Sequence, residues 1–115
     1  MFKARWTRRA TADYDDLRKQ AEKALASRRS SGKGKTSRQE GLFKQIHKAV
    51  RLLLNNPKHP SLNTHKFESL QSPFDENAAV FEAYAQNDTP GAYRIFWCYG
   101  PGRGEMTIIA ITPHP

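Results

Sequence analysis

Apolar residues recur along this chain with two different periods, and the periods divide it into predicted strands and helices. Near the N-terminus, Phe2, Ala4 and Trp6 alternate with Lys3 and Arg5. A period of two is typical of a strand with one buried face, so we expect a strand over residues 2–7.

Two longer segments carry apolar residues at helical spacing. Thr11 is the expected N-cap of the first helix, which should run to about Arg29. Ser37 and Glu40 have the spacing of a capping box, so the second helix should begin there and end before Pro57. Its apolar stripe comprises Leu42, Phe43, Ile46, Val50, Leu53 and Leu54. The basic segment 30–35 should connect the two helices.

The second half of the chain predicts strands. Residues 80–85, 92–99 and 106–112 are apolar runs, and residues 67–70 could form a further short strand. The connections at 87–91 and 100–104 are short enough to join antiparallel neighbours. We therefore predict an α+β fold in the order β-α-α-β-β-β, with two N-terminal helices packed on one face of a small antiparallel sheet.

Length and charge narrow the picture further. The chain has 115 residues, which fits one domain spanning 1–115, and its net charge is +8. Residues 1–60 contain sixteen Lys and Arg against five acids, whereas residues 61–115 contain three against six. A basic N-terminal half favours a polyanionic partner such as a nucleic acid.

Four short segments give the sequence a family likeness. They are His59-Pro60-Ser61-Leu62, Thr64-His65-Lys66, Ala92-Tyr93-Arg94 and the closing Ile111-Thr112-Pro113-His114-Pro115. Together with the predicted order of elements, they resemble the RelE/ParE superfamily of bacterial toxins, and the resemblance covers nearly the whole chain. It departs from the pattern at His59, where some relatives carry Glu, and in lacking a terminal tyrosine.

The resemblance implies a function and partners. In the RelE branch it implies the toxin of a toxin-antitoxin system, a metal-independent endoribonuclease that cuts mRNA, usually in the ribosome, and needs no cofactor. A cognate antitoxin would hold it inactive. In the ParE branch the target is DNA gyrase instead, and a catalytically inactive RNA-binding relative is a third hypothesis.

Cleavage of RNA by its own 2'-oxygen needs a base, an acid and a cation for the charged phosphorane. Arg94 is the expected cation because a guanidinium can hold two phosphate oxygens. Strand alternation places it opposite Tyr93, Ile95 and Trp97, on an open concave side. The alternative is a surface arginine paired with Glu82.

The resemblance and imidazole chemistry indicate His114 as the acid, and the alternative is a frayed chain end. For the base, His59, His65, Lys66 and Glu82 are all candidates near the expected rim. We select His59 and Lys66.

RNA contacts are expected on the basic helical face and in the last turn, at Arg18, Lys19, Lys44, Lys48, Arg51 and Arg103. The four histidines lack the spacing of a metal site. No apolar run reaches the roughly 20 residues of a membrane-spanning helix, and the N-terminus lacks the features of a secretory signal. We therefore expect a cytoplasmic protein.

Overall fold

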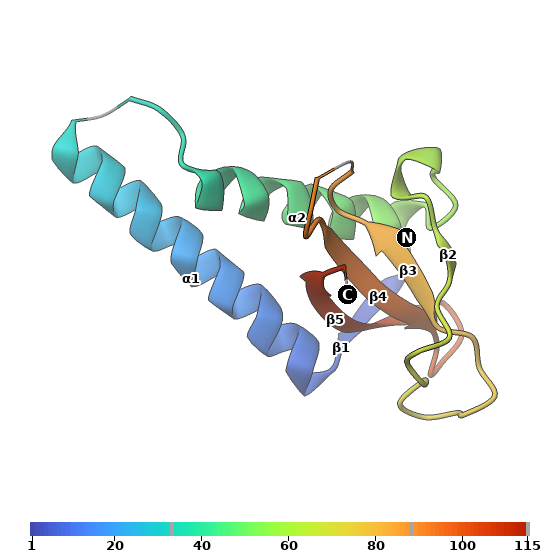
Figure 1. Cartoon of the computed structure of the whole chain (residues 1–115). Helices are drawn as coiled ribbons and strands as arrows, with labels where there is room; N and C mark the ends of the chain where they lie inside the picture. Colours follow the sequence, from blue (N-terminus) through green and yellow to red (C-terminus); the bar gives the residue numbers. More distant parts are fainter. Residues whose placement is uncertain (33, 88, 115) are drawn as a thin grey trace.

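The computed structural model describes residues 1–32, 34–87 and 89–114 (Figure 1). It contains two helices, a short 3-10 turn and five strands. Their bounds are β1 Lys3–Trp6, α1 Arg8–Ser31, α2 Arg38–Asn55, η1 Pro60–Leu62, β2 His65–Lys66, β3 Phe81–Tyr84, β4 Tyr93–Tyr99 and β5 Glu105–Pro113. The predicted α+β order is confirmed, with β2 as an additional two-residue strand. Pro115, which the resemblance included, and parts of the segments 30–35 and 87–91 lie outside the described residues.

The strands form one sheet in the order β1-β5-β4-β3-β2. The pairs β2–β3, β3–β4 and β4–β5 are antiparallel, whereas β1 lies parallel to β5. The predicted antiparallel sheet is confirmed for β2 to β5, and β1 adds a parallel strand at its edge. The parallel pairing of β1 with β5 is possible because the two helices form the long crossover connection that lies between β1 and the antiparallel strands.

Helix α1 begins earlier than the sequence suggested. Its N-cap is Thr7, not Thr11: the Thr7 hydroxyl accepts from the Ala10 N–H at 3.0 Å and donates to the Ile109 carbonyl at 2.7 Å. Asp13, one turn later, accepts the Ile111 N–H at 2.9 Å. Beyond the end of β1, side chains from the first turns of α1 therefore form hydrogen bonds with the edge of β5.

Helix α2 has the predicted capping box. Ser37 accepts from the Glu40 N–H, and the Glu40 carboxylate accepts from the Ser37 N–H at 2.8 Å. The same carboxylate receives two hydrogen bonds from Arg28 of α1, at 2.9 and 3.1 Å. This contact ties the two helices together near the end of the hairpin that extends beyond the sheet (Figure 1).

The two faces of the sheet differ in character. On one face, Ile95, Trp97 and Ile108 pack against helix residues that include Leu17 and Ile46. The opposite face, which we call the concave face, carries a smaller apolar cluster of Val80, Phe96, Cys98, Ile109 and Ala110, covered by Phe67 and Leu70. The predicted strand over 67–70 is therefore wrong: the strand is limited to His65 and Lys66, with one further hydrogen bond from the Phe67 N–H to the Val80 carbonyl at 2.8 Å. Phe67 and Leu70 then pack over this cluster.

Candidate active site

A buried carboxylate lies at the centre of the concave face. Glu82 in β3 is fully buried, and its neighbours along the strand, Phe81 and Ala83, pack in the cluster under the helices. Successive side chains of a strand point to opposite faces, which accounts for the placement of Glu82. A buried carboxylate is costly without positive partners, so the groups around it define the site.

Two imidazoles approach Glu82 from neighbouring parts of the sheet. His65 Nε2 lies 3.0 Å from Glu82 Oε1, and His114 Nδ1 lies 3.0 Å from Glu82 Oε2. Both histidine side chains are 48% exposed, so the carboxylate is buried beneath rings that reach the surface. His114 is also fixed through its backbone, because its N–H donates to the Ala92 carbonyl at 2.8 Å. It is therefore not a frayed end.

Arg94 lies on the predicted face but is more enclosed than expected. It is only 7% exposed, its guanidinium carbon stacks 3.6 Å from the ring centroid of Tyr84, and Nη1 donates to the carbonyls of Gln86 and Tyr93. Its Nε lies 3.9 Å from Glu82 Oε1, beyond hydrogen-bond distance. The alternative pairing with Glu82 is thus present as a buried, loose contact rather than a surface ion pair.

A small hollow adjoins this cluster. It has a volume of about 230 Å³ and is lined by Arg9, Phe67, Ser69, Leu70, Phe96 and Thr112. Thr112 is the cross-strand neighbour of Arg94, but the Arg94 guanidinium lies over Tyr84 and does not line the hollow. Arg9 supplies a positive charge at this hollow, and Phe67, Leu70 and Phe96 supply its apolar surface. Cys98 lies deeper on the same face, where burial raises the pKa of its thiol and makes it less reactive.

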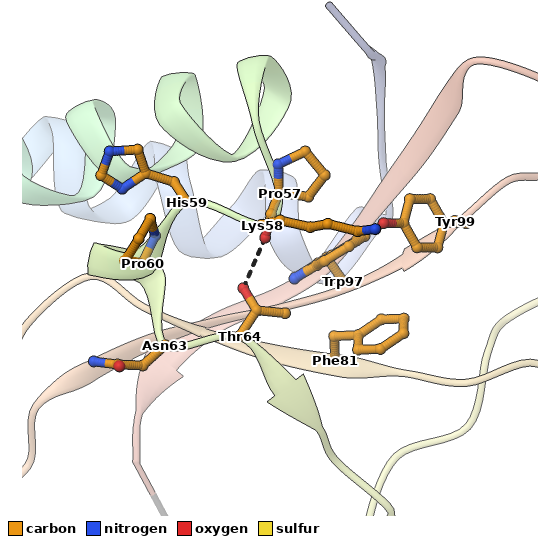
Figure 2. A pocket seen from close by; sticks show the side chains of 9 residues that line it. All are labelled: Pro57, Lys58, His59, Pro60, Asn63, Thr64, Phe81, Trp97 and Tyr99. Atoms are coloured by element: carbon orange, nitrogen blue, oxygen red, sulfur yellow. Dashed lines mark hydrogen bonds between the residues drawn. The ribbon is translucent and has the colours of Figure 1, made fainter.

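His59 and Lys66 do not join the cluster around Glu82. His59 Nδ1 accepts from the Ser61 N–H at 3.2 Å, which fixes the turn into η1. It lines a separate cavity of about 570 Å³ together with Lys58, Phe81, Trp97 and Tyr99 (Figure 2). In this view the His59 ring points away from Phe81 and Tyr99. Lys66 follows His65 in β2 and so points to the other face of the sheet.

Two groups in the cluster were considered but not selected from the sequence. Glu82 and His65 were candidates for the base, and their cross-strand pairing, which brings them together, is set by the register of β2 on β3. The signal in the sequence was a single charged residue inside an apolar strand. Such a residue is either functional or structurally paired when it faces inward.

The predicted RNA contacts occupy different environments. Arg18 is held on α1 by Asp15 at 3.5 Å and Glu22 at 3.0 Å, so its charge is already neutralised. The remaining candidates are exposed: Lys19, Lys44, Lys48, Arg51 and Arg103. In the described part of the chain, no helix is long and apolar enough to cross a membrane, and no three His, Cys, Asp or Glu side chains are grouped as they would be around a metal ion.

Comparison with known proteins identifies the fold. A solved structure of the YoeB/ParE toxin from Agrobacterium tumefaciens superposes with a TM-score of 0.61, covering 98% of this chain and 99% of that one at 11% identity. No protein-family model and no curated protein sequence matches the chain. The chain therefore has the fold of the RelE/ParE toxins, as the sequence motifs suggested.

Proposed function

We propose that this protein is the toxin of a toxin-antitoxin pair and acts as a metal-independent endoribonuclease on mRNA, in the ribosome and in the cytoplasm. The observation that carries the proposal is the gathering of Arg94, His65 and His114 around one buried carboxylate on the sheet face opposite the helices. The structural likeness to a YoeB/ParE toxin supports the class of protein and a cognate antitoxin as its partner.

In this proposal the chain cleaves RNA through attack of a ribose 2'-oxygen on the adjacent phosphorus, which expels the 5'-oxygen and leaves a cyclic phosphate. Arg94 stabilises the charge that accumulates on the phosphorane oxygens. His114 transfers a proton and acts as the acid when it protonates the leaving oxygen. His65 adds a second positive charge beside the same carboxylate when it is protonated.

The identity of the base is a separate part of the proposal. His59 and Lys66 lie outside the cluster around Glu82. Either residue can act as the base only if the bound RNA extends across the sheet from β2 to His114 at the end of β5. Alanine variants of these two residues test that role. Retention of cleavage in both would assign the base to another group.

The decisive experiment is mapping of new 5' ends in cellular mRNA after induction of the protein, beside its Arg94→Ala and His114→Ala variants. Lys23→Ala, which removes an exposed charge on α1, is the matched control. We expect breaks within coding sequences that disappear in both site variants and persist in the control. Circular dichroism should show all variants folded.

Two other outcomes would contradict the proposal. Growth arrest with DNA damage and intact mRNA would move the assignment to gyrase inhibition. Unbroken mRNA together with RNA binding that weakens steeply with salt would indicate a binding protein without catalysis, because phosphate contacts release counterions.

A further inference from the structure

The proposed reaction gives no role to Glu82, although Glu82 is the most buried charged group in the described part of the chain. We propose that Glu82 is a positioning residue that fixes one tautomer of His114 and thereby makes Nε2 the nitrogen that exchanges protons with RNA. This inference rests on the proposed ribonuclease function for its kinetic consequence. Its structural consequence can be measured independently of cleavage.

The tautomer follows from the hydrogen-bond chemistry of the two groups. An ionised carboxylate can only accept hydrogen bonds, so His114 Nδ1, 3.0 Å from Glu82 Oε2, must carry the proton. In the neutral ring this leaves the lone pair on Nε2, pointing away from Glu82. The same contact fixes the orientation of the ring, which the exposure of His114 would otherwise leave free.

His65 lies against the other carboxylate oxygen of Glu82. Its Nδ1 lies 2.9 Å from the Asn63 carbonyl, an acceptor, and its Nε2 lies 3.0 Å from Glu82 Oε1. The contact of Nε2 with Glu82 Oε1 is close in distance but is not a hydrogen bond, because Glu82 Oε1 has no hydrogen-bond partner among the described residues. Among the described residues, the hydrogen bond that Glu82 receives from a side chain therefore comes from His114 Nδ1.

The purely structural alternative is that Glu82 exists to neutralise Arg94. The distances oppose it, because Arg94 Nε is 3.9 Å from Glu82 Oε1 and neither atom has a hydrogen-bond partner among the described residues. Arg94 instead donates to two carbonyls and stacks on Tyr84. The short contacts of Glu82 go to the imidazoles, so orientation of those rings is its main effect.

The test combines nitrogen NMR with cleavage kinetics. Long-range proton-nitrogen correlation of the histidine rings at about pH 8.5, above the ordinary imidazole pKa of about 6.5, should show the Nδ1–H tautomer at His114 in the unmodified protein. Glu82→Gln should give a mixture of tautomers and lower the cleavage rate constant by about 10²-fold or more, with a smaller change in KM. Glu82→Asp should recover part of the rate.

Glu76→Gln, which removes an exposed carboxylate from a loop, is the matched control and should change neither readout. An Nε2–H tautomer at His114 in the unmodified protein would overturn the inference, even if Glu82→Gln failed to fold. Full cleavage by Glu82→Gln would overturn it as well. If the unmodified protein cuts no RNA, the proposed function fails, and the tautomer alone decides whether Glu82 positions His114.

Discussion

Glu40 and Glu82 each face an arginine, but the two pairs are built differently. Between the helices, Arg28 gives Glu40 two hydrogen bonds, and the Ser37 N–H gives a third. On the concave face, Arg94 approaches Glu82 only to 3.9 Å, and the short contacts come from two half-exposed histidines. The first carboxylate is fully engaged in holding helices together, whereas the second supports groups that reach the surface.

This difference indicates how each pair contributes to the protein. A carboxylate with matched donors lowers the free energy of the folded state through those contacts. A buried carboxylate with incomplete hydrogen bonding contributes little to stability, because its desolvation offsets the attraction to its partners. This weak contribution to stability is consistent with the functional role that we propose for the cluster around Glu82.

The largest expected effect comes from removing both charges of the buried pair. The double variant Glu82→Leu/Arg94→Met should leave the free energy of unfolding unchanged or raise it by about 1 to 4 kcal/mol, since apolar groups replace imperfectly satisfied ones. Urea denaturation measures this change. If the proposed function holds, RNA cleavage should be lost in the same variant, because the cation proposed to stabilise the phosphate is absent.

The matched variant of the other pair is Arg28→Met/Glu40→Leu, which should lower the free energy of unfolding and leave the cluster around Glu82 intact. Its effect comes from losing the contact between the helices and the acceptor for the Ser37 N–H. If the double variant at Glu82 were the more destabilised of the two, the concave-face pair would be primarily structural.

Much of the fold was predictable because its signals are local. Helical spacing and the Ser37 capping box located α2, and period-two alternation assigned Arg94 and Trp97 to opposite faces. The start of α1 was not predictable in the same way. Thr7 and Thr11 are both good N-caps, and the choice depends on a bond from Thr7 to Ile109, 102 residues away.

The site was less predictable than the fold because it depends on register. Arg94 and His114 were each predicted from the sequence, but their common neighbour Glu82 became evident only when β3, β4 and β5 were aligned. His59 was selected as a base together with Lys66, and in the structure its Nδ1 accepts a hydrogen bond within a turn. The burial of Arg94 under Tyr84 is also a tertiary effect that strand alternation does not reveal.

A smaller effect is expected from the cap of α2. Ser37→Ala removes the acceptor for the Glu40 N–H and should lower the free energy of unfolding by about 1 kcal/mol. Ser37→Asp, which restores an N-cap acceptor, should recover most of this loss. Urea denaturation of the two variants provides the measurement. At a temperature where both variants are folded, RNA cleavage should be unchanged. A loss of cleavage would show that the helix hairpin affects the cluster around Glu82.

The smallest effect should appear as a pH dependence of stability. Hydrogen bonds from Arg28 and Ser37 lower the pKa of Glu40 from 4.5 to about 2. Since the folded-state pKa lies below the unfolded one, the stabilisation is complete above about pH 4.5 and disappears as the pH falls towards 2. The difference in unfolding free energy between the unmodified protein and Glu40→Gln should therefore shrink over this range. A difference that stayed constant from pH 6 to about pH 2.5 would show that the Glu40 charge does not stabilise the hairpin.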